Sequence, residues 1–246
     1  MITLSIVSHG QRDIALHLLQ DLARLQPAHV TEIIYTANIH EPDLPAIEFG
    51  HIRLLIIRNE RPKGFGSNHN AAFYRCQSPY FCVMNPDLRL ADDPFSPLID
   101  GFAQKRRGLM APRIYSPEGR LENTARKLYT VPELLKQKLS PQNHGTQPDW
   151  IAGMFLLFKS RAYHEIGGFD EGYFLYIEDV DICTRLCLAG WTLAQTEKAC
   201  VIHEARKQSH RSLRFTLWHI AGMLRYWSSL GFWRYRARLK KEERRG

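Results

Sequence analysis

The sequence lacks the features that define several other classes of protein. No uninterrupted apolar run approaches the roughly 20 residues that a helix needs to cross a bilayer. The first ten residues, MITLSIVSHG, have neither the basic start nor the small-residue cleavage site of a signal peptide. Internal repeats and low-complexity segments are also missing. We therefore expect a chain without a membrane span or a secretion signal, whose first residues form a buried strand.

Cysteine is sparse, and its spacing suggests no framework of disulfides. The five cysteines are odd in number and include no Cys-x-x-Cys pair. Cys183 and Cys187 lie one turn apart on an expected helix, where zinc, a disulfide or buried free thiols are the alternatives. Buried free thiols are the commonest state of such residues. We favour free thiols, and hence a protein of the reducing cytoplasm.

Size and composition are those of an ordinary globular protein. The chain has 246 residues, of which 44% are hydrophobic and 24% charged, and this suits one large α/β domain or two small ones. The net charge of +8 is unevenly placed, because residues 206–246 hold twelve Lys and Arg against two Glu. The basic character therefore belongs to the C-terminal segment, and the rest of the chain is close to neutral.

This C-terminal segment interleaves aromatic and basic residues. Trp218, Trp227 and Trp233 alternate with arginines, and a run of Lys and Arg follows up to residue 245. Such a pattern is typical of an amphipathic helix at an anionic membrane surface. A helical hairpin packed on the domain, with a solvated basic end, is the alternative, and the neutral body argues against nucleic acid. We favour membrane contact through residues 212–245.

Hydrophobic periodicity predicts alternating strands and helices in the first 90 residues. The predicted strands cover residues 2–7, 32–36, 52–57 and 80–84, and the predicted helices cover 13–25 and 68–76. This alternation is typical of βαβ units in a mostly parallel sheet. Further along, we expect a polar excursion over the site at 112–148, apolar strands at 150–158 and 199–202, and a helix at 178–190.

Polar residues follow the predicted strands at the point where each strand ends. They are Ser8-His9, Thr36-Ala37-Asn38, Arg58-Asn59 and Asn85-Pro86-Asp87. In parallel α/β sheets, ligands bind beyond the carboxyl ends of the strands. The sequence therefore predicts a nucleotide pocket at this edge.

Three short patterns suit nucleotide chemistry, and each has a simpler alternative. The loop KGFGSNHN, residues 63–70, lets backbone N–H groups approach a phosphate, or is a plain turn into a helix; no GKS or GKT follows, so it is not a P-loop. Asn85 and Asp87 supply oxygen ligands for a divalent cation, or form a turn. His203 is a further metal ligand, or a surface histidine.

Three carboxylates fall within four residues at Glu178, Asp179 and Asp181. They follow the aromatic and apolar run YFLYI, and charge beside apolar surface is where a base with a shifted pKa can be built. An acidic first helical turn is the alternative interpretation. The two interpretations are compatible if the first turn of the helix carries a catalytic carboxylate.

The order of these pieces along the chain is more informative than any one of them. A strand ending in SHG precedes KGFGSNHNAA, then FCVMNPDLRL, then a stretch from WIAGMF to YIEDVDICTRLCLAGW, and finally VIH. This order resembles the family 2 inverting glycosyltransferases of the GT-A fold over most of residues 1–205, and within them the rhamnosyltransferase-like group that builds bacterial surface polysaccharides. The resemblance implies an α/β fold with a Rossmann-like, mostly parallel central sheet flanked by helices, followed by a C-terminal helical basic tail.

The resemblance also implies donor-side roles for matching residues. Ser8 and His9 would lie against the nucleotide, and Asn38 stands where the family usually has an acidic residue that reads the base. The residues of the nucleotide-side loop would be Lys63, Gly64, Gly66 and Asn70.

The resemblance also implies residues for the metal site, the catalytic base and the acceptor side. Asp87 matches the aspartate of a DxD motif that holds Mg²⁺ or Mn²⁺ on the diphosphate, Asn85 replaces the first aspartate of that motif, and His203 completes the metal site. Asp179 matches the catalytic base. Glu178 is assigned to the catalytic pair with Asp179, and the acceptor side would be lined by Trp150, Gly153 and Asp181. The alternative for Glu178 and Asp181 is to orient the acceptor or to cap the helix.

These roles imply inverting transfer of a sugar, first choice dTDP-L-rhamnose, to a saccharide or lipid-linked saccharide acceptor. The alternatives are another donor, such as UDP-galactofuranose, UDP-glucose or UDP-GlcNAc, and a non-catalytic nucleotide-sugar-binding protein. A nucleotidyltransferase would need a basic triphosphate loop near the N-terminus, which SHGQ does not supply. We expect a nucleotide-sugar-binding half at 1–110, an acceptor-binding and catalytic half at 111–205 and a tail at 206–246. The expected location is cytoplasmic, peripheral on the inner face of the cell membrane.

Overall fold

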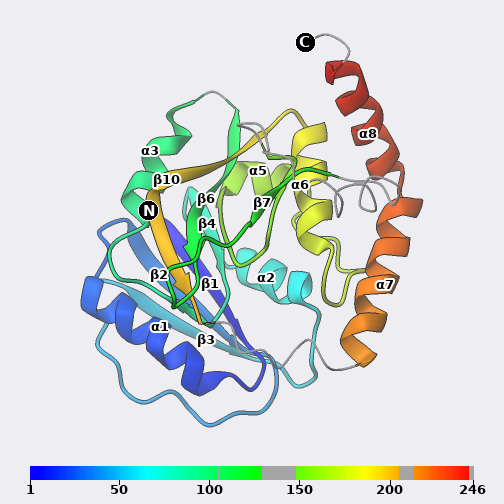
Figure 1. Cartoon of the computed structure of the whole chain (residues 1–246). Helices are drawn as coiled ribbons and strands as arrows, with labels where there is room; N and C mark the ends of the chain where they lie inside the picture. The colour runs from blue at the N-terminus through cyan, green and yellow to red at the C-terminus, as the bar shows by residue number, and fades with distance from the viewer. Residues whose placement is uncertain (105, 129–147, 205–212, 244–246) are drawn as a thin grey trace.

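The computed structural model of the chain describes residues 1–104, 106–128, 148–204 and 213–243 (Figure 1). Its strands are β1 (Ile2–Ser8), β2 (Val30–Ala37), β3 (Arg53–Arg58), β4 (Tyr80–Met84), β5 (Leu88–Arg89), β6 (Arg107–Tyr115), β7 (Ala125–Arg126), β8 (Trp150–Ile151), β9 (Phe155–Lys159) and β10 (Thr192–His203). Its helices are α1 (Arg12–Leu25), α2 (Phe65–Phe73), α3 (Phe95–Asp100), the short 3₁₀ turn η1 (Gly101–Ala103), α5 (Ser160–Glu165), α6 (Glu178–Leu188), α7 (Leu213–Ser228) and α8 (Leu230–Glu243).

Eight strands form the central sheet in the order β3-β2-β1-β4-β9-β6-β10-β5, and β7 pairs with β8 in a small antiparallel sheet. β1 lies parallel to both β2 and β4, with Ile6 opposite Tyr35 on one side and Met84 on the other. β9 is antiparallel to β4 and β6, and β5 is antiparallel to β10. The predicted α/β sheet, mostly parallel, is confirmed.

Two stretches differ from the sequence-based prediction. Residues 112–115, assigned to the polar excursion, are the end of the buried strand β6. Pro112 is tolerated there because the pairing of β6 with β10 shifts register between Thr196 and Cys200. The apolar run at 150–158 is two strands, since a turn separates β8 from β9. The part of the excursion at 129–147 lies outside the described residues, as do 205–212 and 244–246 of the tail.

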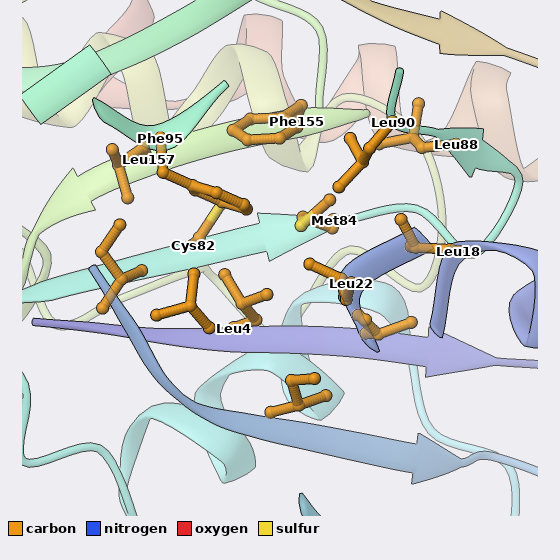
Figure 2. Packing of buried hydrophobic residues seen from close by; sticks show 14 of the residues in the cluster. Leu4, Leu18, Leu22, Cys82, Met84, Leu88, Leu90, Phe95, Phe155 and Leu157 are labelled. Atoms are coloured by element: carbon orange, nitrogen blue, oxygen red, sulfur yellow. The ribbon is translucent and has the colours of Figure 1, made fainter. Parts of the chain in front are cut away.

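Two clusters of buried side chains lie on the two faces of the sheet. Along β4, Cys82 and Met84 belong to one cluster and Phe81 and Val83 to the other, as the alternation of a strand requires. Figure 2 shows the first cluster, where Leu22 of α1 packs over β1 and β4. The second cluster lies between the sheet and α2, α5 and α6. The acidic helix α6 therefore packs on the face of the sheet that carries the second cluster.

The C-terminal helices pack beside α6 (Figure 1). Tyr226 of α7 and Phe232 of α8 are buried in the second cluster. The Tyr226 hydroxyl lies 2.6 Å from Oγ1 of Thr184, and Arg238 donates to the Cys187 carbonyl at 2.7 Å. The predicted helical tail is therefore confirmed, with its inner face docked on the domain. Across the described residues, no helix is both long enough and apolar enough to span a bilayer.

The cysteines of α6 are free thiols, as predicted. Cys183 and Cys187 are buried, and this burial raises the pKa of both thiols. A thiol with a raised pKa stays protonated and unreactive, so neither residue is a candidate nucleophile.

Leu22→Ala removes a fully buried side chain from the first cluster, and we expect the free energy of unfolding to fall by about 2–5 kcal/mol. The loss combines reduced apolar burial with an unfilled cavity. The matched variant Leu217→Ala, at a position that is 64% exposed on α7, should change stability by less than about 0.5 kcal/mol. Urea unfolding followed by circular dichroism measures both, and equal losses would contradict the assigned core.

Candidate active site

Asn38 organises the carboxyl ends of the first strands. Its buried amide nitrogen donates to the Lys63 carbonyl at 2.9 Å and lies 3.1 Å from Nδ1 of His9. Its amide oxygen accepts from the Lys63 backbone N–H at 2.8 Å and from the Asn59 amide at 2.9 Å. The structure thus brings together His9, Asn38 and Lys63, which the sequence analysis placed on the donor side.

Glu41 is a residue that the sequence analysis missed. Its carboxylate accepts hydrogen bonds from the Ser8 hydroxyl and the Tyr35 phenol, both at 2.6 Å. Burial, and then the hydrogen bond and charge of Glu41, raise the pKa of Tyr35 and keep the phenol a donor. Glu41 therefore puts a carboxylate beside Ser8, although Asn38 occupies the position where the resemblance implied one. The only signal in the sequence was an acidic residue a few positions past a strand.

The glycines of the 63–70 loop are required by close packing. An added Cβ at Gly64 would lie 2.9 Å from the Phe174 carbonyl oxygen, and one at Gly66 would lie 2.6 Å from Cβ of Phe169. The Asn70 amide continues this contact, because it accepts from the Phe169 backbone N–H and donates to the Phe169 carbonyl, each at 2.9 Å. The loop is therefore locked to the segment that precedes α6.

A hollow of about 980 Å³ lies beside this loop, and Lys63, Gly64 and Asn70 are among the residues that line it. Asp87 and His203 do not line this hollow. The hollow therefore does not include the predicted metal ligands, and the nucleotide-binding role of the loop stays a prediction.

Asp87 and His203, 116 positions apart in the sequence, meet at the edge of the sheet where β5 pairs with β10. Nε2 of His203 lies 3.3 Å from Oδ2 of Asp87. Nδ1 of His203 lies 3.2 Å from both oxygens of Glu122, a residue that the sequence analysis did not identify. Asn85 begins the same turn, and its backbone N–H donates to the Met154 carbonyl at 2.9 Å.

This arrangement fits a divalent cation. Oδ1 of Asp87 is buried and has no hydrogen-bond partner, so it has an unused acceptor. Glu122 can hold the proton of Nδ1 and leave Nε2 of His203 free, which is how histidine ligands are usually oriented. Burial lowers the pKa of His203, but its hydrogen bond to Asp87 and the charges of Asp87 and Glu122 outweigh burial and raise it. Within the described ranges no three or more Asp, Glu, His or Cys side chains are grouped so that they could hold a metal ion by themselves, so the remaining ligands would come from substrate and water.

The acid pair begins α6 and is held by backbone groups. Oδ2 of Asp179 accepts from the Gly153 N–H at 3.1 Å, and Oδ1 accepts from the Val180 N–H at 2.8 Å. Glu178 is only 5% exposed, and its Oε2 has no hydrogen-bond partner. Burial, followed by the neighbouring charge of Asp179, raises the pKa of Glu178 to about 8, and burial raises the pKa of Asp179 as well. The pair therefore resists carrying two negative charges.

The turn before the acid pair is strained. Tyr176 and Ile177 have φ angles of 73° and 70°, and a β-branched residue in this left-handed region is costly. Gly222 of α7 lies against them, where an added Cβ would meet the Tyr176 carbonyl oxygen at 3.0 Å and the Ile177 side chain at 3.1 Å. Helix α7 therefore supports the turn that aims Glu178 and Asp179.

A pocket of about 530 Å³ opens in front of the acid pair. Trp150, whose Nε1 donates to the Lys127 carbonyl at 3.2 Å, lines it together with Glu178 and Asp179. The lining residues that the sequence analysis did not assign are Asn123, Arg126, Lys127, Leu128, Ala152, Tyr176, Ile177, Val180, His219, Met223, Tyr226 and Trp227. The sequence analysis predicted membrane contact for the α7 segment, with a packed helical hairpin as the alternative, and the spacing of its residues gave no sign that they face the site.

Asp181 is placed differently from its acidic neighbours. Its Oδ2 accepts from Nε of Arg185 at 2.7 Å, and Arg185 also donates to the carbonyls of Ile166 and Gly168. Asp181 does not line the 530 Å³ pocket. Its contacts tie α6 to the preceding segment, and its predicted acceptor role remains without a supporting contact.

Comparison with known proteins identifies the class. The family described as "Glycosyl transferase family 2" matches residues 6–167. The chain is 30% identical over 247 residues to rhamnosyltransferase WbbL of Escherichia coli (strain K12), and the match covers 92% of each chain. The chain therefore belongs to glycosyl transferase family 2 and to its rhamnosyltransferase-like group, as the resemblance implied. N-acetylglucosaminyl-diphospho-decaprenol L-rhamnosyltransferase of Mycobacterium tuberculosis (strain ATCC 25618 / H37Rv) is 31% identical over 160 residues, which are 56% of this chain and 50% of that protein.

Solved structures agree on the fold. GalNAc-T7 with UDP, GalNAc and Mn²⁺ superposes with a TM-score of 0.66 at 15% identity, over 85% of this chain and 44% of that one. TarS 1-349 of S. aureus in complex with UDP-GlcNAc gives a TM-score of 0.64 at 11% identity, over 93% and 67% of the two chains. These likenesses confirm the GT-A glycosyltransferase fold.

Glu178→Gln should flatten the dependence of stability on pH. The pKa of Glu178 is about 8 in the folded chain against 4.5 for an ordinary glutamate, so between these values the folded state holds a proton that the unfolded state has released. The free energy of unfolding of the wild type should therefore fall as pH rises through this window, at a rate of at most about 1.4 kcal/mol per pH unit from this group. Glutamine cannot ionise and removes that slope.

Urea midpoints from pH 5 to pH 9 measure the effect. The variant and the wild type should be similar near pH 5, and the variant should be the more stable at pH 9. Glu165→Gln, at an exposed position, is the matched control and should keep the wild-type slope. Identical slopes in Glu178→Gln and the wild type would contradict the buried acid pair.

Proposed function

We propose that the chain is an inverting glycosyltransferase that moves L-rhamnose from dTDP-L-rhamnose to a saccharide or lipid-linked saccharide acceptor in bacterial polysaccharide synthesis. The observation that carries the proposal is the acid pair Glu178-Asp179 on the wall of a pocket of about 530 Å³. The relatives support the choice of sugar, since WbbL and the mycobacterial protein are both rhamnosyltransferases, and the name of the latter includes a diphospho-decaprenol carrier.

Asp179 is the base in this proposal. Its Oδ2, oriented by the Gly153 N–H, takes the proton of the acceptor hydroxyl while that oxygen bonds to the anomeric carbon. The bond from this carbon to the diphosphate breaks on the opposite side, so the configuration inverts. Because Asp179 has two backbone donors and Glu178 has no partner on Oε2, the single charge of the pair belongs on Asp179. Protonated Glu178 then donates a hydrogen bond to the acceptor.

Asp87 and His203 would hold Mg²⁺ or Mn²⁺ in this proposal, with Glu122 orienting the imidazole. The ion would stabilise the negative charge that develops on the leaving diphosphate. The neighbour GalNAc-T7 was solved with UDP and Mn²⁺, and the mannosyltransferase PcManGT of Pyrobaculum calidifontis with GDP-Man and Mn²⁺. Asn85 lowers the negative charge of this site relative to a second aspartate.

The nucleoside would lie at the carboxyl ends of β1 to β4. Ser8, His9 and Asn38 converge there, and Glu41 adds the acidic group that a thymine or uracil N–H can use as an acceptor. Residues 1–110 then serve mainly the donor, and residues 111–205 mainly the acceptor and the chemistry.

The outer face of the C-terminal helices suits a membrane surface. Leu217, Ile220 and Leu224 are exposed at helical spacing on α7, and Leu230 and Trp233 are exposed on α8. Basic residues of α8 accompany them, and this combination favours the headgroup region of an anionic bilayer. We place the protein in the cytoplasm, peripheral on the inner face of the cell membrane, where a lipid-linked acceptor would be available.

Asp179→Asn should lower sugar transfer by about 10²–10⁴-fold, because the amide cannot accept the proton of the acceptor hydroxyl. Binding of the nucleoside diphosphate should be unchanged, since the side chain keeps its size. The control Asp92→Asn, at an exposed position outside the pocket, should retain wild-type turnover. Chromatographic detection of product and a thermal shift with dTDP give the two readouts, and normal turnover by Asp179→Asn would refute the assigned base.

A melting-temperature panel tests the donor and the metal together. Saturating dTDP or dTDP-L-rhamnose with Mn²⁺ should raise the melting temperature by about 5 °C or more, because a ligand that binds only the folded state stabilises it by mass action. EDTA or Asp87→Ala should remove most of the shift, and Asp92→Ala should not. A shift with UDP compounds alone would select another donor. A shift of the same size with and without Mn²⁺ would contradict the metal site. The absence of a shift with every nucleotide tested would contradict the proposed function.

A further inference from the structure

The segment of residues 170–177 leads directly into the acid pair and lies between α2 and α7. On the side of α2, the Phe65 N–H donates a hydrogen bond to the Phe174 carbonyl at 2.9 Å. On the side of α7, the centroid of the Phe174 ring lies 4.6 Å from that of Trp218. The segment is therefore held from both sides, and its placement determines where Glu178 begins α6.

Arg225 of α7 holds the beginning of this segment. Its Nη2 donates to both carboxylate oxygens of Asp170, at 3.0 and 2.9 Å, and its Nε donates to Oδ2 at 3.2 Å. Its guanidinium carbon lies 5.3 Å from the ring centroid of the buried Tyr173. An added Cβ at Gly172 would collide with the guanidinium, so this glycine leaves the room that Arg225 occupies. One side chain of α7 thus contacts the segment at three positions.

The end of the segment is the left-handed turn at Tyr176 and Ile177. A turn of this kind is costly and persists only where the surrounding structure holds it. Gly222 of α7 lies against this turn, and Arg225, three positions later, is its neighbour on the helix surface. Helix α7 therefore contacts the segment at both ends, and Arg225 contributes a charge-assisted contact that fixes its direction.

The exposure of the ion pair separates a role in positioning from a role in stability. The side chains of Arg225 and Asp170 are 49% and 34% exposed, and ion pairs at such positions contribute little to global stability. Arg225 does not line the pocket in front of the acid pair. Both partners also lie beyond residue 167, where the match to family 2 ends. An effect of Arg225 on the acid pair therefore acts through the placement of the segment.

We propose that Arg225 is a positioning residue for sugar transfer, whose contact with Asp170 fixes the segment 170–177 and thereby the direction in which Glu178 and Asp179 point into the pocket. The inference rests on the proposed function and deepens it, because it assigns to the C-terminal helices a residue on which the chemistry depends. Arg225 acts through the segment and does not touch the substrate.

A simpler interpretation is that Arg185 of α6 holds this part of the chain and that Arg225 is a surface cation. Nη1 of Arg185 donates to the carbonyls of Ile166 and Gly168, at 2.8 and 2.7 Å. These contacts lie before the segment and leave the segment itself to α7. The two interpretations predict different results, since removal of a surface cation changes nothing at the acid pair.

Titration of the Glu178 carboxyl carbon by ¹³C NMR reads the placement of the acid pair without any substrate. The wild type should show a step near pH 8, because Glu178 is buried. Arg225→Gln should let the turn relax and water reach this carboxyl, which should lower the step by about one pH unit or more. Loss of a distant cation would by itself raise the pKa, so the sign of the change identifies its cause. Arg225→Lys can keep one contact with Asp170 and should lower the step less.

The other titratable and charged groups that line the pocket with Glu178 stay in place in these variants: Arg126, Lys127, Tyr176, Asp179, His219 and Tyr226. Arg161→Gln, at an exposed position of α5, removes the same charge and is the matched control. Its titration step and its turnover should be those of the wild type.

Steady-state kinetics with dTDP-L-rhamnose and octyl N-acetylglucosaminyl diphosphate as the acceptor probe give the second readout. Arg225→Gln should lower kcat about tenfold or more and leave the KM for the donor unchanged, because small misplacements of a reacting group are costly. Asp170→Asn should give a similar loss, since the amide keeps the size of the side chain and loses the charge. The double variant should lose no more than either single variant, because both changes break one contact.

An unmoved or raised titration step in Arg225→Gln would overturn the proposal, and so would losses in kcat that multiply in the double variant. Sugar transfer by the wild type together with an unmoved step would remove this inference and leave the proposed function. A lowered step in a chain that transfers no sugar and shows no thermal shift with dTDP would do the reverse, and Arg225 would then position an acid pair of another function.

Discussion

Burial of two adjacent carboxyls at the start of α6 is the constraint on which the site depends. Glu178 and Asp179 resist being charged at the same time in this environment, because burial and mutual repulsion raise the pKa of the pair. Backbone donors on Asp179 select where the one charge resides. The strained turn at Tyr176 and Ile177 aims both groups into the pocket, and Gly222 of α7 allows the close contact that supports this turn. The C-terminal helices are therefore part of the site as well as a surface.

In the proposed mechanism, the two halves of the reaction draw on different parts of the fold. Parallel strands bring Ser8 and Asn38 to one edge of the sheet, as open α/β sheets do for nucleotides. The pairing of β5 with β10 brings Asp87 to His203. The antiparallel insertion of β9 and the turn at Gly153 then carry the chain to α6. In this account, the sheet edge serves the donor diphosphate, and the space between α6 and α7 serves the acceptor.

Features that depend on local patterns could be predicted from the sequence, and features that depend on distant contacts could not. The strands β1 to β4, the acidic start of α6 and the candidate ligand Asp87 are readable because periodicity and strand-end chemistry are local. The sequence analysis did not predict strand β6, and one reason is that Pro112 argues against a buried strand. The register shift in β10 makes a proline acceptable at this position. Glu41, Glu122 and the α7 wall were missed because their partners lie 33, 81 and 42 positions away, respectively, and only tertiary packing brings them together. Asp181 looked equivalent to Asp179, but the phase of the helix turns it toward Arg185.

The most direct test of this account is a titration of the carboxyl carbons of Glu178 and Asp179 by ¹³C NMR, with the two signals assigned through Glu178→Gln and Asp179→Asn. The account predicts two linked steps, one of them near pH 8, in which ionisation of one group displaces the signal of the other. Two independent titrations near pH 4, each unaffected by removal of the neighbour, would mean that the pair is solvated and uncoupled. That result would contradict the buried acid pair, and with it the mechanism assigned to the pocket.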